Sequence, residues 1–124
     1  MKKIALLALL TAAVGGCGSS SGGSGTFSLT WGLTQNGATV SCAAENAVTL
    51  SVTATPIGGT ARSPDLFDCA DMAGTTDPFP VGTYHVQIQL LDSANRQLNL
   101  VTPTATFTIV NGIDVDLGDF TFAF

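Results

Sequence analysis

Residues 83–91 read TYHVQIQLL and carry the clearest strand pattern in the chain. Apolar residues alternate here with polar ones, which is the period-two pattern of a half-buried β-strand. We predict a strand in which Tyr84, Val86, Ile88 and Leu90 face a core. His85 lies between two inward residues, so it should face solvent as an ordinary surface side chain.

The same alternation recurs along the chain, and no stretch has the 3.6-residue period of a helix. Turn signals separate the predicted strands at Asn36-Gly37, Gly58-Gly59, residues 92–95 and Asn111-Gly112. The two Asn-Gly pairs predict hairpins, whereas Pro103 predicts an edge position or a sheet crossing. Seven or eight short strands in about 100 residues predict an all-β fold, a single antiparallel two-sheet β-sandwich. The remaining candidate strands lie at residues 27–34, 40–42, 48–54, 66–69, 98–100, 105–109 and 113–124.

The last predicted strand changes the parity of its apolar positions at Gly118. A one-residue bulge at this glycine would let both halves of the strand face the core. Trp31, in the first strand, is also assigned to the core. The predicted inward residues of the last strand are Ile113, Val115, Leu117, Phe120, Phe122 and Phe124.

Residues 79–86 read FPVGTYHV and contain a P-x-G-x-Y pattern. This pattern resembles a segment of transthyretin-like, carboxypeptidase-regulatory-like and Cna-B-type sandwich modules. The resemblance implies an immunoglobulin-like or transthyretin-like sandwich and says nothing of a ligand. Trp31 precedes both Cys42 and Cys69, whereas immunoglobulin domains place their tryptophan between two cysteines.

The N-terminus reads as an export signal. Two lysines precede an eleven-residue apolar run, residues 4–14, which is too short to span a bilayer. The run ends in Val14-Gly15-Gly16-Cys17, which resembles the lipobox of bacterial lipoproteins. That resemblance implies that signal peptide 1–16 is removed and that Cys17 is lipidated on sulfur and acylated at its amine. The alternative is an ordinary secretory signal with an unmodified Cys17.

No aspartate follows Cys17, and in lipoproteins of Gram-negative bacteria this implies the outer membrane of the cell envelope. Residues 17–25, the lipidated cysteine and the sequence GSSSGGSG, should form a flexible tether. The β-sandwich domain is then expected at residues 26–124.

Loss of Lys2 and Lys3 with the signal would leave two arginines against nine acidic residues, a formal charge of about -7. Nucleic acid and anionic headgroups are recognised through basic patches, so neither is an expected partner. Cys42 and Cys69 form an even pair in an exported domain, which predicts a disulfide. A metal or redox site is the weaker interpretation, because two cysteines 27 positions apart and one remote histidine match no ligand spacing.

Two acidic groups are candidates for calcium, which prefers oxygen ligands in loops. Neither has the glycine and glutamate placement of an EF-hand. The second group alternates along the outward side of the last strand, as a solvated face does. The first group, around residues 70–80, which we predict to be irregular, comprises Asp65, Asp68, Asp71 and Asp77, and the second comprises Asp114, Asp116 and Asp119.

Catalysis has few candidates, because the expected mature chain has one histidine, one tyrosine and no lysine. No nucleophile and base can be paired, so we expect neither an enzyme nor a cofactor. The sequence predicts a small membrane-anchored lipoprotein whose sandwich serves binding or structural support at the cell envelope. Its partner would be an envelope protein or polymer. A calcium-dependent adhesion module at the cell surface is the alternative function.

Overall fold

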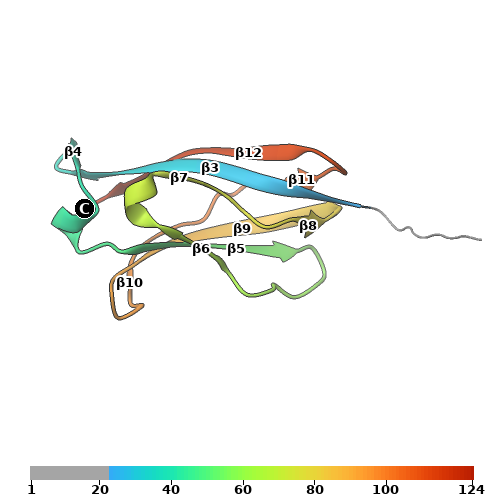
Figure 1. The fold of residues 1–124 in the computed structure, drawn as a ribbon, viewed down its shortest axis with the longest axis horizontal. Coiled ribbons are helices and arrows are strands. Elements are labelled where there is room, and N and C mark those ends of the chain that lie inside the picture. Colours follow the sequence, from blue (N-terminus) through green and yellow to red (C-terminus); the bar gives the residue numbers. More distant parts are fainter. Residues whose placement is uncertain (1–22) are drawn as a thin grey trace, which may run out of the picture.

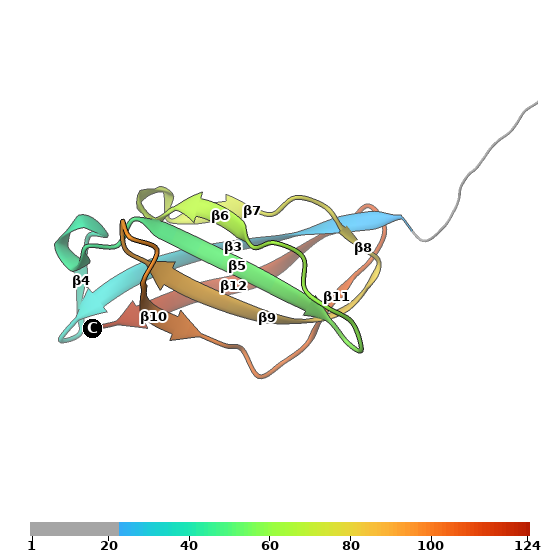
Figure 2. The same cartoon turned by 90° about the horizontal axis from the view of Figure 1, so that it is seen from below.

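The structure is a computed structural model that describes residues 23–124. Signal peptide 1–16, Cys17 and residues 18–22 of the predicted tether lie outside the described residues. Residues 23–124 form ten strands in two sheets that pack face to face (Figures 1 and 2). The predicted all-β two-sheet sandwich is confirmed, and the strand count exceeds the prediction because several strands have only two or three residues.

The first sheet is antiparallel and is built around β9 (Gly82–Leu91), which contains the stretch with the clearest alternation. β5 (Thr49–Pro56) pairs with β9 along its whole length and carries β6 (Asp65–Asp68) on its other side. β10 (Gln97–Val101) and β11 (Phe107–Ile109) pair with successive parts of β9. Pro103 lies between these two edge strands, as predicted.

The second sheet is built around β3 (Ser24–Gln35). β4 (Ala38–Val40), β7 (Ala73–Thr75) and β8 (Phe79–Pro80) pair antiparallel with successive parts of β3. The predicted hairpin at Asn36-Gly37 joins β3 to β4, and both turn residues have positive φ angles.

β12 (Asp114–Ala123) is parallel to β3, and this is the one parallel pair among the otherwise antiparallel strands of residues 23–124. Asn111-Gly112 does form a turn, in which the Ile113 N–H donates to the Val110 carbonyl over 3.1 Å. This turn leads from β11 in the first sheet to β12 in the second, so the hairpin predicted there was wrong.

The core lies between the two sheets and contains most of the residues that the alternation assigned to it. Trp31 is buried, and the four inward residues of β9 are all buried, while His85 is exposed as predicted. Burying each large apolar side chain contributes roughly 1.5–3 kcal/mol, which makes this layer the main stabilising feature of the domain. The core residues of β3 and β5 are Phe27, Leu29, Trp31, Leu33, Leu50, Val52 and Ala54.

The predicted bulge in β12 is present. Asp116 pairs with Ser28 and Gly118 with Leu29, so Leu117 is the additional residue. Gly118 adopts a φ of +105°, and its N–H donates to Asp116 Oδ1 over 2.9 Å. Leu117, in the bulge, and Phe122, beyond it, are both buried.

The ends of the last predicted strand do not reach the core. Ile113 is 52% exposed and Phe124 is 36% exposed, because both lie just beyond the bounds of β12. Their assignment to the core was therefore wrong. Val115 and Phe120 are partly buried against the core.

β3 begins at Ser24, within the stretch predicted to be tether. Gly25 pairs with Phe79, and a Cβ on Gly25 would lie 2.5 Å from the Ile113 carbonyl oxygen. The Ser24 carbonyl also accepts a hydrogen bond from the Gly112 N–H over 2.8 Å. Gly25 thus belongs to the fold because its missing side chain lets three segments approach closely.

The chain passes from one sheet to the other between β6 and β7, through the 3-10 turn η3 (Cys69–Asp71). The predicted disulfide is confirmed here: Cys69 is bonded to Cys42, which precedes the 3-10 turn η2 (Ala43–Glu45).

Residues 70–80, predicted to be irregular, contain β7 and β8. This segment was hard to identify because its strands are too short to show an alternation.

Candidate functional site

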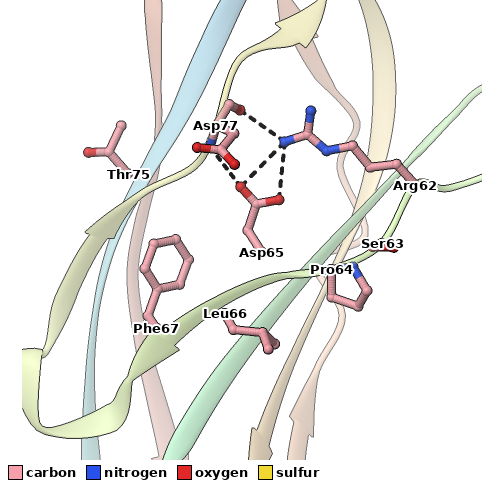
Figure 3. Close-up of a pocket in the computed structure, with 8 residues that line it drawn as sticks. All are labelled: Arg62, Ser63, Pro64, Asp65, Leu66, Phe67, Thr75 and Asp77. Carbon is pink, nitrogen blue, oxygen red and sulfur yellow. Dashed lines mark hydrogen bonds and ion pairs between the residues drawn. The ribbon is translucent and has the colours of Figure 1, made fainter.

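A surface pocket of about 660 Å³ opens where edge strand β6 of one sheet lies beside edge strand β7 of the other (Figure 3). We call it the β6–β7 pocket. One side is apolar, with Pro64, Leu66 and Phe67, and the other carries hydroxyl and carboxylate groups. It is lined by Arg62, Ser63, Pro64, Asp65, Leu66, Phe67, Thr75 and Asp77.

The loop before β6 brings Arg62 to this pocket. β5 ends at Pro56, and the Gly59 N–H donates to the Pro56 carbonyl over 3.0 Å, which closes a tight turn. Gly58, at the centre of that turn, has a φ of +77°, a conformation that glycine adopts without strain. The predicted end of the strand at Pro56 and Gly58-Gly59 is thus confirmed.

Arg62 joins its own loop to the segment between β7 and β8. Its Nη1 donates to the Pro78 carbonyl over 2.6 Å, and its Nη2 donates to the Asp77 carbonyl over 3.0 Å. Nη2 also lies 3.1 Å from Asp65 Oδ1, and the guanidinium carbon lies 3.6 Å from the centre of the Phe79 ring. Carboxylate, carbonyl and aromatic partners therefore surround this cation.

Asp65 is the acceptor at the centre of this arrangement. Its side chain is only 9% exposed, and it accepts hydrogen bonds from Arg62 and, over 2.7 Å, from the Asp77 N–H (Figure 3). A buried carboxylate is stable only with such partners. Asp65 is thus a structural group that holds two loops together.

The structure does not bring the first predicted calcium group together. Asp65 is committed to Arg62, and Asp77 enters the same arrangement through its backbone. Asp68 and Asp71 border a different pocket, of about 500 Å³, next to Cys42 and Ser93. Within residues 23–124, no group of three or more acidic, histidine or cysteine side chains is arranged to hold a metal ion.

The second acidic group forms hydrogen bonds across the outer face of β3 and β12. Asp114 accepts from Thr26 Oγ1 over 2.6 Å and from Ser28 Oγ over 2.5 Å. Asp119 accepts from Thr30 Oγ1 over 2.7 Å. The hydroxyls of Ser28 and Thr26 hold the pKa of Asp114 below its usual value, against a smaller opposing effect of burial. These hydroxyl partners of Asp114 and Asp119 were not predicted from the sequence, because they depend on the parallel pairing of β12 with β3.

The remaining candidates for acid–base chemistry, Tyr84 and His85, are neighbours in β9 but lie on opposite faces of the sheet. His85 is exposed on the outer side of β9, where it pairs with Thr55 of β5. Tyr84 is buried, and its hydroxyl donates to the Pro80 carbonyl over 2.5 Å within the P-x-G-x-Y segment. Burial raises the pKa of Tyr84, and the nearby positive charge of Arg62 opposes that rise. The tyrosine hydroxyl thus anchors the start of β9.

The β6–β7 pocket can bind a ligand by shape and by a few hydrogen bonds. Leu66 is 63% exposed at its rim. Phe67 packs against Gly74, where a Cβ would lie 2.5 Å from the ring. Thr75 and Asp77 supply hydroxyl and carboxylate oxygens opposite this apolar side (Figure 3). An apolar wall facing a few polar groups is a usual composition for a binding surface.

Comparison with known proteins finds no family model that matches the chain. A search of curated proteins likewise finds no significant match. In the part of the chain that the structure describes, no helix has the length and apolar character needed to cross a membrane.

Proposed function

We propose that the chain is a small lipoprotein of the cell envelope, anchored through lipidated Cys17, with a non-catalytic sandwich for binding or structural support. The observation that carries this proposal is the position of Val14-Gly15-Gly16-Cys17 only six residues before Gly23, where the described fold begins. A signal, a cysteine, a short connection and a folded domain follow one another in the order that a lipid-anchored protein requires.

Two further features support export and anchoring. The Cys42–Cys69 disulfide suits an oxidising compartment outside the cytoplasm. Stable anchoring needs more than one acyl chain, and the lipobox resemblance implies such a multiple anchor. The absence of an aspartate after Cys17 favours the outer membrane.

We place binding at the β6–β7 pocket, with an envelope protein or polymer as the partner. Leu66 and Phe67 supply an apolar wall, and Thr75 and Asp77 face it with polar groups. The Tyr84–Pro80 hydrogen bond fixes the start of β9, and the P-x-G-x-Y segment that contains it supports a transthyretin-like or immunoglobulin-like arrangement. Such a scaffold presents its loops and edges for recognition.

The anchor is tested by Cys17→Ser, with Ser20→Ala as a matched tether control. We expect the mutant either to leave the membrane fraction or to keep its signal peptide, whereas the control remains membrane-bound and processed. Mass spectrometry of the wild-type N-terminal peptide should show acyl chains on Cys17. A processed Cys17→Ser protein that still fractionates with membranes would contradict the proposal.

A calcium-dependent adhesion module is the second candidate function. Asp68 and Asp71 border the same pocket beside the disulfide, which favours this candidate. Calcium takes six to eight oxygen ligands, so carbonyls and water would have to complete the site. A melting temperature that neither calcium nor a chelator changes would eliminate this candidate.

A further inference from the structure

Figures 1 and 2 show the end of the sandwich at which the chain enters it. Several large apolar side chains are exposed in the segments that form this end. We call this the tether end and define it as residues 23–25, 56–61, 80–83 and 110–113. Its four large apolar residues are about half exposed: Ile57 55%, Val81 45%, Val110 52% and Ile113 52%.

Backbone hydrogen bonds and strand pairing hold these residues around Gly23 and Gly25. The Val81 N–H donates to the Gly23 carbonyl over 3.3 Å, and a Cβ on Gly25 would meet the carbonyl oxygens of both Val110 and Ile113. β9 and β11 pair Gly82 with Ile109, so Val81 and Val110 flank that pair. The apolar side chains therefore surround the point at which the tether enters.

Ile57 joins the same end through β9. Its N–H donates to the Thr83 carbonyl over 3.0 Å, two residues from Val81. Exposed apolar groups that are gathered at one end of a domain mark a contact surface more strongly than groups scattered singly.

Charge is distributed unevenly between the two ends of the sandwich. The four segments of the tether end contain no charged residue. The nearest acid along the chain, Asp114, is bonded to Thr26 and Ser28 on the outer face of the second sheet. At the opposite end of β5, beside the disulfide, lie Glu45, Asp68, Asp71 and Asp92, with Arg96 as the accompanying cation.

The tether is too short to let the domain move far from its anchor. Six residue steps separate Cys17 from Gly23, which is about 20 Å even when fully extended. Acyl chains on Cys17 would thus keep the tether end close to the bilayer at all times. An uncharged apolar surface at that distance gains free energy by leaving water for the interface.

We propose that the tether end rests on the phospholipid bilayer, with Ile57, Val81, Val110 and Ile113 in contact with the headgroup and acyl boundary. This inference rests on the proposed lipid anchor. The domain would then stand on the membrane with its acidic end pointing away. Such an orientation keeps the carboxylates of that opposite end away from anionic headgroups, which would repel them.

The test uses the lipoprotein purified from membranes and reconstituted in phosphatidylcholine nanodiscs that contain a gadolinium-chelating lipid. Paramagnetic relaxation of backbone amides reports their proximity to the membrane. We compare the wild type with a Val81→Ser, Val110→Ser, Ile113→Ser variant. The matched control is Val48→Ser, Leu66→Ser, Leu100→Ser, which removes three exposed apolar side chains outside the tether end.

We expect strong relaxation of the tether-end amides in the wild type and in the control, and a several-fold loss in the tether-end variant. Amides near Glu45 and Asp92 should be little affected in the wild type. An unchanged profile in the tether-end variant would overturn the inference, because the tether alone would then explain the proximity. If the spectrum of the triple variant shows that it is not folded, Val110→Ser alone is used. This single variant must then show the same several-fold loss of relaxation at the tether-end amides.

Mass spectrometry of the same preparation separates the two proposals. A lipidated Cys17 with a flat relaxation profile overturns the contact with the bilayer and leaves the anchor intact. An unmodified Cys17 overturns the anchor, and the membrane contact with it.

Discussion

Trp31 Nε1 donates a 2.9 Å hydrogen bond to the backbone carbonyl of Cys69. The bond connects the middle of β3 to the crossover between β6 and β7. A second bond, from the Trp31 N–H to the Met72 carbonyl over 3.0 Å, connects the same two regions. The indole also packs against Phe67 at a ring-centre distance of 6.0 Å. Trp31 thus links the core to the segment that carries the disulfide and the β6–β7 pocket.

Trp31→Phe should therefore destabilise the domain by more than the loss of apolar area alone. The Cys69 carbonyl would lose its indole partner and keep only the Met72 N–H as a donor, at a cost of about 0.5–1.5 kcal/mol. Denaturation followed by far-ultraviolet circular dichroism measures the change. Phe124→Leu, at a partly exposed position, is the control and should shift the free energy of unfolding by less than about 0.5 kcal/mol. Equal midpoints for the two variants would contradict the role assigned to the hydrogen bond.

The disulfide between Cys42 and Cys69 should contribute about 3.5 kcal/mol, because it restricts the unfolded chain. Cys42→Ala and Cys69→Ala should lower the free energy of unfolding by similar amounts, since either change removes the same bond. Reduction of the disulfide in the wild type should lower the free energy of unfolding by about as much as either substitution. Thiol titration of the denatured, oxidised protein that detected Cys42 and Cys69 as free would contradict the pairing.

The sequence predicted features that depend on local pattern, and it missed those that depend on which strands become neighbours. The bulge at Gly118 was predictable because the apolar positions change parity there. The parallel pairing of β12 was not, because a period-two pattern is the same in parallel and antiparallel strands. Asn111-Gly112 signals a turn, but a turn signal does not fix which sheet the next strand joins.

For a similar reason, the hydrogen bonds that Arg62 makes to Asp65, Asp77 and Pro78 were not predicted from the sequence. A loop has no periodicity, so nothing predicts that Arg62 reaches the carbonyls of Asp77 and Pro78. One signal was available: each of the two arginines lies three or four residues from an aspartate, at Arg62 and Asp65 and at Asp92 and Arg96. That spacing suggests ion pairs, which would have argued against Asp65 as a calcium ligand.

Gly118→Ala tests the bulge, with Gly32→Ala as a matched control. A Cβ at either glycine would meet no atom within 4 Å, and the two glycines differ in that Gly118 has a φ of +105°. We expect Gly118→Ala to destabilise by more than about 1 kcal/mol, because alanine is strained at positive φ. Gly32→Ala should be neutral or slightly stabilising. Similar free energies of unfolding for the two variants would mean that the bulge does not need the glycine conformation.

Asp114 should make the free energy of unfolding depend on pH in the acidic range. Its folded pKa is lowered by the hydroxyls of Ser28 and Thr26, so its contribution is complete above the unfolded value of about 3.9 and is lost as the pH falls through the folded pKa. Asp114→Asn should therefore lower the free energy of unfolding at neutral pH. It should also make that free energy depend less on pH below about pH 4. The double variant Thr26→Val, Ser28→Ala removes the donors, and adding Asp114→Asn to it should then change little. Additive effects would show that the hydroxyls do not stabilise the carboxylate.

Arg62 and Arg96 allow a direct comparison of two ion pairs within residues 23–124. Arg96 pairs with Asp92 over 3.0 Å, and its side chain is 79% exposed, whereas that of Arg62 is 37% exposed. The two partner aspartates differ little, at 12% for Asp92 and 9% for Asp65. Exposed pairs contribute about 0–1 kcal/mol. Hydrogen bonds to charged groups in less exposed positions contribute about 1.5–3 kcal/mol.

We therefore expect Arg62→Ala to lower the free energy of unfolding by about 1.5–3 kcal/mol and Arg96→Ala by less than about 1 kcal/mol. Arg62→Lys should recover little, because a single ammonium lacks the planar fork of donors that reaches Asp65 and the two carbonyls together. Chemical denaturation of the three variants ranks their free energies of unfolding. A double variant tests the pair itself: Asp65→Asn should destabilise the Arg62→Ala protein less than it destabilises the wild type. If Arg62→Ala and Arg96→Ala shift the midpoint equally, the Arg62 arrangement does not stabilise the rim of the β6–β7 pocket.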